Sequence, residues 1–151
     1  MTHFKKVRKG IKATFSPAER VFLSDVLPLL AEVGQEADDP AASRLHVPVY
    51  LDDPEANDEW WRLMGKELDD ARREDRAVYR KVIAADDGIV LDDEQANAFL
   101  RVLNEGRLVL GARMGVEVES DHYELSEHAR QVLDYLGWVL EELTEILSRS
   151  L

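Results

Sequence analysis

The chain of 151 residues contains no cysteine. This absence excludes disulfide bonds, thiolate nucleophiles, cysteine-based zinc sites and redox sensing by thiols. No run of apolar residues approaches the length of about 18 that a membrane-spanning helix needs, and the N-terminus lacks the apolar core of a signal peptide. We therefore expect a soluble, cytoplasmic protein that does not contact a membrane.

The short motifs of the common enzyme classes are also absent. There is no nucleophile elbow, Walker-type phosphate loop, dinucleotide fingerprint or zinc-protease helix. Only four histidines occur, and the spacing of His122 and His128 puts them on different sides of a helix. The paired aspartates mostly fall at expected turns and helix starts, where carboxylates cap amide groups. We expect no enzyme activity, no metal site and no cofactor.

Beyond the first twenty positions, thirty acidic residues outnumber thirteen basic ones. The net charge is −12, yet residues 1–20 hold six Lys or Arg side chains and one Glu. A basic arm on an acidic chain can contact nucleic acid or an acidic partner. The alternative is that these side chains protect the edge of a short β-hairpin. The residues concerned are Lys5, Lys6, Arg8, Lys9 and Lys12.

Apolar periodicity predicts a mainly α fold, a single four-helix domain over residues 1–151 built around one long buried helix at residues 92–114. Asp92 and Gln95 form a capping-box pattern at its start, and Gly115 is placed to end it. Apolar residues occupy nearly all of its faces, which is typical of a buried helix. Gly106 within it destabilises a helix by about 1 kcal/mol relative to Ala, so we expect another helix to approach closely there.

Three further helices are expected at about residues 17–33, 54–85 and 121–148. Pro28 predicts a kink in the first of them. In the second, an apolar stripe that contains Trp60, Leu63 and Met64 is expected to face the core. Trp61 falls beside this stripe and is predicted either to be partly buried at a seam or to contact a partner.

A small sheet is expected beside the helices. Residues 4–15 alternate loosely between apolar and polar and break at Gly10, a pattern that favours a β-hairpin. Residues 89–91 form a similar short apolar run before the central helix. We expect them to add a third strand to the hairpin.

Arg107 is the most informative polar residue of the central helix. Its position in the apolar stripe, next to Asn104, predicts that it lies on the inner face. We expect a buried arginine held by an acid such as Asp134 or by helix carbonyls, as part of a structural network. The alternative is an anchor for an anion or a protein partner.

Three stretches of the chain resemble a family of small actinobacterial proteins of unknown function that are now labelled AosR-type oxidative stress transcriptional regulators. They are DDPEANDEWWRLMGKEL at 52–68, residues 91–115 with the pattern LNEGRLVLGARMG, and YLGWVLEELTEIL at 135–147. Members are commonly encoded beside the protease adaptor ClpS. The family signature falls on four positions, for which we expect a structural role: Asn104, Arg107, Gly111 and Arg113.

The resemblance implies a cytoplasmic, non-enzymatic regulator that acts through a protein partner, such as a stress sigma factor or the transcription machinery. Because the chain has no cysteine, a thiol switch cannot be transferred to it. Two alternatives remain open: direct DNA binding through residues 5–12, and a ligand-binding domain with a pocket near Arg107. A homodimer with Trp61 or the outer face of the last helix at the contact is a further expectation.

Overall fold

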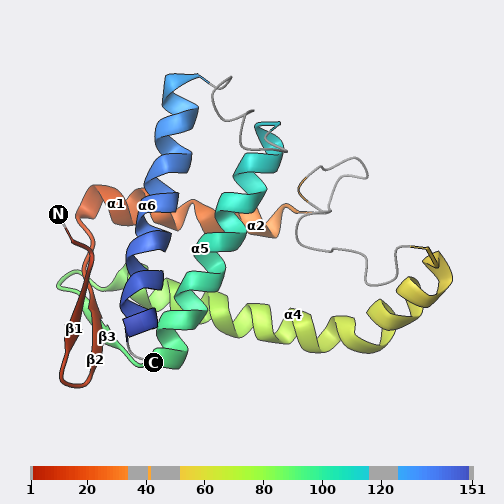
Figure 1. Ribbon diagram of the computed structural model, residues 1–151, viewed down its shortest axis with the longest axis horizontal. Coiled ribbons are helices and arrows are strands. Elements are labelled where there is room, and N and C mark those ends of the chain that lie inside the picture. The colour runs from red at the N-terminus through yellow and green to blue at the C-terminus, as the bar shows by residue number, and fades with distance from the viewer. Residues whose placement is uncertain (1, 34–40, 42–51, 116–125, 150–151) are drawn as a thin grey trace.

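The computed structural model describes residues 2–33, 41, 52–115 and 126–149. Within these ranges the chain forms helices and a small sheet, in the order β1, β2, α1, α2, α4, β3, α5 and α6 (Figure 1). The predicted fold class, mainly α with a small N-terminal sheet, is confirmed.

The sheet consists of the N-terminal hairpin and one later strand. β1 (Phe4–Val7) pairs antiparallel with β2 (Gly10–Ala13), and β2 pairs antiparallel with β3 (Ile89–Leu91). Gly10 has a φ of 151°, and a Cβ at this position would lie 2.1 Å from the carbonyl oxygen of Leu91. Glycine therefore lets β3 approach β2, and the predicted third strand is confirmed.

The helix expected over residues 17–33 is divided into α1 (Pro17–Ser24) and α2 (Val26–Ala31). Pro28 explains the division. A proline has no amide proton for the carbonyl four residues earlier, and its ring collides with that carbonyl, which here belongs to Ser24. The break therefore falls at Asp25, before the proline that causes it.

Capping residues determine where two of the helices begin. Ser16 and Glu19 exchange hydrogen bonds at the start of α1, and Asp92 and Gln95 do the same at the start of α5 (Asp93–Arg113). Gly115, with a positive φ of 83°, follows the end of α5. These signals are local in the sequence, so the predicted bounds of α5 agree with the structure to within one residue.

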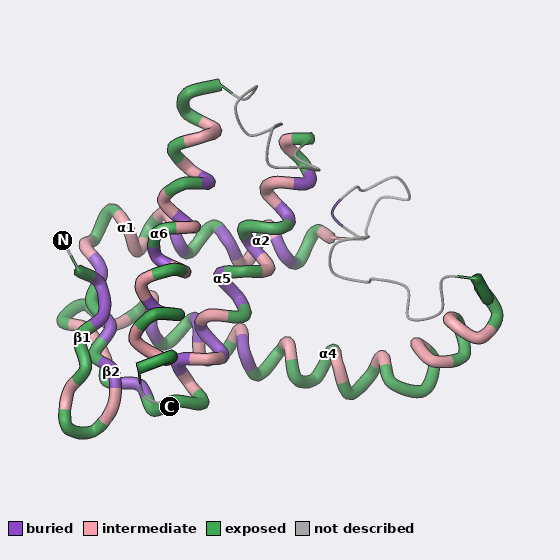
Figure 2. Tube along the Cα trace, viewed as in Figure 1, coloured by how far each residue is buried: buried purple, intermediate pink, exposed green. Residues whose placement is uncertain are grey.

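α5 is the central helix of the described fold and packs against α2, α4 and α6. Figure 2 shows how much of it is buried. Gly106 faces α2, where a Cβ would lie 2.7 Å from Cγ1 of Val26, so the close approach expected at this glycine is confirmed. The buried residues of α5 are Ala96, Ala98, Phe99, Val102, Leu103, Gly106, Val109 and Ala112.

α4 (Pro54–Ala84) has two halves with different surroundings (Figures 1 and 2). Its buried residues, Asp75, Tyr79 and Val82, all lie in the second half. The first half extends away from the other described elements. The prediction that Leu63 and Met64 face the core is therefore wrong, because the packed length of α4 ends before it reaches them.

α6 (Glu127–Arg149) packs its apolar side against α5. Its predicted start at residue 121 lies outside the described residues. Among the helices of the described ranges, not one combines the length and the apolar character that crossing a membrane requires. The buried residues of α6 are Leu133, Leu136, Val139 and Leu143.

Candidate functional site

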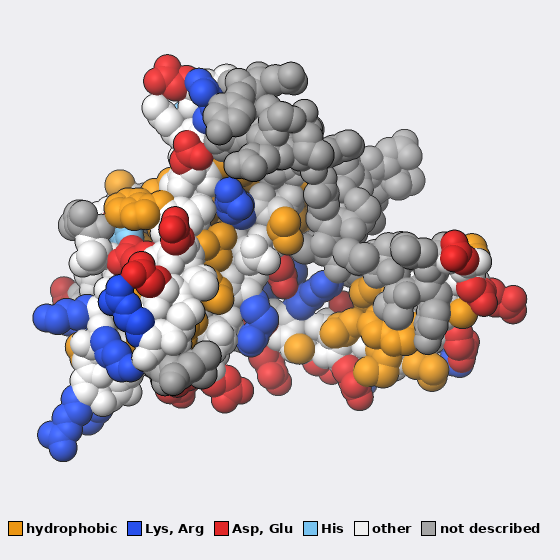
Figure 3. All heavy atoms as spheres, viewed as in Figure 1, with side chains coloured by type: hydrophobic (Ala, Val, Ile, Leu, Met, Phe, Trp, Pro, Cys, Tyr) orange, Lys and Arg blue, Asp and Glu red, His pale blue; other side chains and the backbone are white. Residues whose placement is uncertain are grey.

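The projecting segment, residues 54–68 at the start of α4, presents large apolar side chains to solvent. Leu63 is 62% exposed and Met64 is 37% exposed. The rings of Trp60 and Trp61 are half-buried and meet edge to face, with their centroids 5.0 Å apart. Figure 3 shows hydrophobic atoms gathered over this end of α4. Contiguous exposed apolar side chains mark interaction sites in soluble proteins, so the segment is a candidate interaction surface.

Acidic side chains border these apolar ones. The projecting segment carries four acidic residues and two basic ones. One of the basic residues, Arg62, donates two hydrogen bonds to Glu59 on the same helix, of 3.0 Å and 2.5 Å. A complementary surface would therefore be apolar at its centre and basic at its border.

The basic residues that the sequence singled out are exposed along the strands and the turn of the hairpin, where Figure 3 shows basic side chains. Lys5 and Lys12 are direct cross-strand partners in the register of β1 and β2. Like charges in such positions destabilise a hairpin. Protection of the sheet edge accounts for Lys5 on the edge strand β1, but it does not account for Lys12 on the central strand β2. The pair therefore favours an anionic contact.

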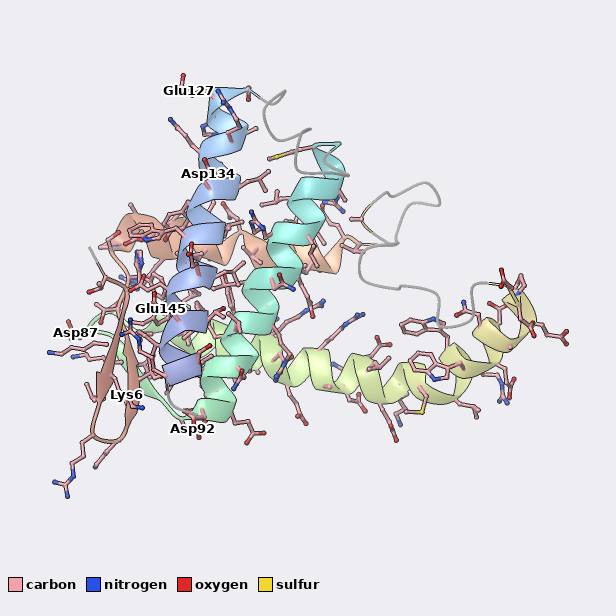
Figure 4. All side chains as sticks on the ribbon, viewed as in Figure 1. Lys6, Asp87, Asp92, Glu127, Asp134 and Glu145 are labelled. Carbon is pink, nitrogen blue, oxygen red and sulfur yellow. The ribbon has the colours of Figure 1, made fainter. Side chains whose placement is uncertain are left out.

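Asn104 and Arg107 line a groove of about 600 Å³ between α5 and α6. Asp134, labelled in Figure 4, lines the same groove from α6. Arg107 is exposed, so the prediction that it lies on the buried inner face is wrong, and the adjacent Gly106 takes the inner position. The Nε of Arg107 donates to the carbonyl oxygen of Leu133 at 3.4 Å, which is one of the helix-carbonyl contacts predicted for it.

The other two signature residues do not join this groove. Nη1 of Arg113 lies 3.5 Å from Oε2 of Glu32, at the end of α2. Gly111 is half-buried on α5. The four signature residues therefore do not form one site, and the structural role expected for them stays a prediction.

Ion pairs join the second half of α4 to α5. Arg101 donates two hydrogen bonds, of 2.8 Å and 2.7 Å, to Asp75, which is only 9% exposed. Glu105 lies 3.8 Å from Arg72 and 3.7 Å from Arg76. Burial raises the pKa of the Glu105 carboxyl above its usual value, although the two arginines oppose this shift. These pairs show that part of the charged middle of α4 packs against α5.

His3 is a buried polar residue that sequence reasoning missed. It is 3% exposed and its ring is stacked on Phe15, with the centroids 5.1 Å apart. Its Nε2 lies 2.5 Å from Oε2 of Glu19, and its Nδ1 lies 3.0 Å from Oε2 of Glu142. A carboxylate only accepts hydrogen bonds, so both contacts form when the imidazole carries both protons. Its partners are 16 and 139 residues away, which leaves no local pattern to read.

Glu19 connects this cluster to the start of α1. One carboxylate oxygen accepts from the backbone amide of Ser16, and the other accepts from His3 and, at 2.6 Å, from the Tyr135 hydroxyl. Burial raises the pKa of the Glu19 carboxyl, but the hydrogen bonds from Tyr135, Ser16 and His3 outweigh it, and the pKa is lowered overall. The cluster joins β1, α1 and α6 and has the character of a structural clamp.

In residues 2–33, 52–115 and 126–149, no group of three or more His, Cys, Asp or Glu side chains is arranged to hold a metal ion. His122, one of the two histidines weighed as ligands, lies outside the described residues.

The comparisons with known proteins give one match. The family model described as Domain of unknown function (DUF2017) matches residues 1–147. No curated protein and no solved structure matches the chain.

Proposed function

We propose that this chain, which belongs to the family described as Domain of unknown function (DUF2017), is a non-enzymatic regulatory protein that acts by binding a protein partner. The observation that carries the proposal is the projecting segment, residues 54–68, where apolar side chains are exposed at the end of a long helix. The second half of α4 packs against α5, and the projecting segment continues from it in the same helix.

The composition of the projecting segment suits a protein interface. Aromatic side chains contribute most of the binding energy at many interfaces, with apolar neighbours that exclude water. Trp60 and Trp61 supply the rings, and Leu63 and Met64 supply apolar area beside them. A preformed helix of this kind binds in a groove or against a second helix of its partner.

The partner's surface should be apolar with a border of Lys or Arg, because acidic residues outnumber basic ones in the segment and the whole chain has a net charge of −12. On the resemblance to AosR-type regulators, we propose a sigma factor or another part of the transcription machinery as the partner class. Since the chain has no cysteine, any response to peroxide has to originate in that partner.

The double variant Leu63→Gln, Met64→Gln tests this surface. Both side chains are exposed, so the substitutions should change binding and leave folding intact. Tagged wild-type protein captured from its own cells, with and without peroxide, should enrich one partner by mass spectrometry, and the double variant should lose it. Val21→Gln is the matched control, because Val21 is a 68% exposed apolar residue on α1.

Titration of the purified partner then measures the effect. We expect the double variant to bind at least about tenfold more weakly than wild type, with the control unchanged. Equal affinities for the double variant and wild type would contradict the proposal. Sedimentation of the protein alone tests whether it forms a homodimer through this surface. A homodimer that the double variant dissociates would assign the surface to self-association instead.

Direct DNA binding by the hairpin is the second candidate function. The opposed pair Lys5 and Lys12 favours it, because strand pairing alone gives no reason to place two like charges face to face. The acidic remainder of the chain opposes it. The two candidates use surfaces at opposite ends of the view in Figure 3, so variants can test them separately.

A further inference from the structure

A small cavity opens between α1 and α6, and it shares no lining residue with the groove at Arg107. Figure 1 draws α1 across α6, and the rings of Phe22 on α1 and Tyr135 on α6 meet edge to face, with the centroids 5.4 Å apart. The volume of about 320 Å³ lies within the range of about 300 to 1,000 Å³ that small-molecule sites occupy. The lining residues are Ala18, Glu19, Phe22, His128, Gln131, Val132 and Tyr135.

The walls of this α1–α6 cavity combine aromatic rings with one carboxylate. The rings of Phe22 and Tyr135 stand at 85° to each other and form an apolar corner. Glu19 is the one Asp or Glu in the described lining, which contains no Lys or Arg. Its side chain is 20% exposed, and a charge attracts a ligand more strongly where water is partly excluded. Aromatic faces attract cations, as does a carboxylate.

The clamp around His3 leaves negative charge at this wall. Glu19 and Glu142 both accept hydrogen bonds from His3, whose imidazole carries at most one positive charge. In the described part of the chain, neither carboxylate pairs with a Lys or Arg. Arg20 pairs instead with an aspartate in the turn after α4, and Arg130 on α6 does not line the cavity. One of the two carboxylates therefore lacks a counter-charge.

We propose that the α1–α6 cavity binds a small organic cation, with its charge beside Glu19 and its apolar part in the corner formed by Phe22 and Tyr135. An ammonium group interacts with a carboxylate and with the face of an aromatic ring at the same time. The bound cation would supply the counter-charge that the clamp lacks. This inference goes beyond the proposed partner binding, because none of the lining residues belongs to the projecting segment.

Isothermal titration at constant ionic strength, with three probes of one shape, tests the proposal. Neohexyl alcohol is neutral. Choline has a positively charged nitrogen in place of the branched carbon of that alcohol, and neohexylamine has an ammonium group in place of its hydroxyl. We expect both cations to bind wild type at least about tenfold more tightly than the alcohol. Tighter binding of neohexylamine assigns a hydrogen bond to Glu19, and tighter binding of choline assigns the charge to the rings.

Two variants in the lining test where the cations bind. Gln131→Lys adds a positive charge at an exposed position of the lining and should weaken the binding of both cations at least about tenfold. Ser148→Lys is the matched control, because it adds the same charge at an exposed position of the same helix, outside the lining. Phe22→Leu keeps an apolar side chain without the ring and should weaken both cations by about threefold or more. The unfolding temperature checks that each variant is folded.

Four results would overturn the proposal. The first is that neither cation binds to wild type. The second is that the alcohol binds as tightly as the cations, because apolar area alone would then account for binding. The third is that Gln131→Lys and Ser148→Lys lose equal affinity, because the attraction would then come from the net charge of the whole chain. The fourth is that Phe22→Leu binds both cations as tightly as wild type.

Discussion

Two tyrosine hydroxyls donate hydrogen bonds of 2.6 Å to acceptors of different charge. Tyr79 donates to the neutral carbonyl of Leu23, whereas Tyr135 donates to the carboxylate of Glu19. Burial raises the pKa of both hydroxyls, and the charge of Glu19 adds to the rise at Tyr135. Both tyrosines are therefore protonated donors at neutral pH. Their hydrogen bonds should contribute differently to stability, because one acceptor is neutral and the other is charged.

Replacing each tyrosine by phenylalanine separates the two cases. Tyr135→Phe removes a hydrogen bond to a charged group and should lower the free energy of unfolding by about 1.5 kcal/mol at pH 7, whereas Tyr79→Phe should lower it by about 1 kcal/mol. The pKa of Glu19 is lowered in the folded state, so its stabilising interactions are present above its unfolded pKa of about 4.3 and are lost as the pH falls through the folded value.

The loss caused by Tyr135→Phe should therefore shrink below about pH 4, while that caused by Tyr79→Phe should stay constant because its acceptor does not titrate. Urea unfolding of both variants and wild type at several pH values measures this. If the two losses keep the same ratio from neutral to acidic pH, the hydrogen bond to Glu19 does not stabilise the fold through the charge of the carboxylate.

At the residue scale, the sequence predicted short-range partners and missed long-range ones. The capping pairs are three residues apart and were found from the pattern alone. The partners of His3 come from α1 and α6 and carry no spacing signal. Arg107 was assigned to the wrong side because apolar residues on several faces of α5 leave the phase of the helix undefined. Arg72 and Arg76, which both lie near Glu105, do have a helical spacing, and that signal could have been read.

Among the helices, two glycines in interior positions have opposite surroundings. A Cβ at Gly106 would lie 2.7 Å from Cγ1 of Val26, whereas the nearest atom to a Cβ at Gly65 is Cε3 of Trp61 at 3.9 Å. A methyl group at Gly106 would therefore collide with the packed side chain of Val26, whereas a methyl group at Gly65 would make an ordinary van der Waals contact with Trp61. The intrinsic preference of a helix for alanine over glycine is the same at both positions.

Alanine at each position should therefore change stability with opposite sign. Gly106→Ala should destabilise the fold by about 1 to 3 kcal/mol, because overpacking α2 against α5 outweighs the helix preference. Gly65→Ala should stabilise α4 by up to about 1 kcal/mol. Thermal unfolding followed by circular dichroism measures both. Stabilisation by Gly106→Ala would show that α2 can move away from α5 without loss.

At the scale of elements, the helices that the caps define were predicted well. Pro28 predicted a kink in the first helix, but the sequence pattern did not predict that the break would lie at Asp25, before the proline. The projecting half of α4 was missed for a different reason. A helical stripe shows which side of a helix is apolar, and it does not show whether a neighbour extends far enough to cover that stripe. Leu63 thus belongs to the predicted apolar stripe and is exposed, whereas Tyr79, in the packed half of the same helix, is buried.

At the scale of the whole molecule, the charge distribution was visible in the sequence and its spatial arrangement was not. Five of the six basic residues among the first twenty lie in the hairpin, while the acidic majority includes the border of the projecting segment. The end of α2 and the middle of α4 line one cavity, to which Leu30 and Arg76 both contribute, and no local pattern in the sequence encodes this placement. Three surfaces of different chemistry therefore occupy separate parts of one small fold.

The charge distribution leads to a test of direct DNA binding. The net charge of −12 repels a duplex, and the hairpin is the basic part that can approach it. We expect wild-type protein to bind duplex DNA weakly at low salt and to lose this binding at physiological salt. Lys5→Gln with Lys12→Gln should reduce the slope of log affinity against log salt by about two, because each phosphate contact contributes about 0.9. Fluorescence anisotropy with a labelled duplex measures the slope.

The control pair Lys66→Gln, Lys81→Gln removes two exposed lysines from α4 and should leave the slope unchanged. Binding that persists at physiological salt and disappears only in the hairpin variant would favour direct DNA recognition over the partner-binding function. Equal losses in both variant pairs would show that the hairpin has no special affinity for DNA.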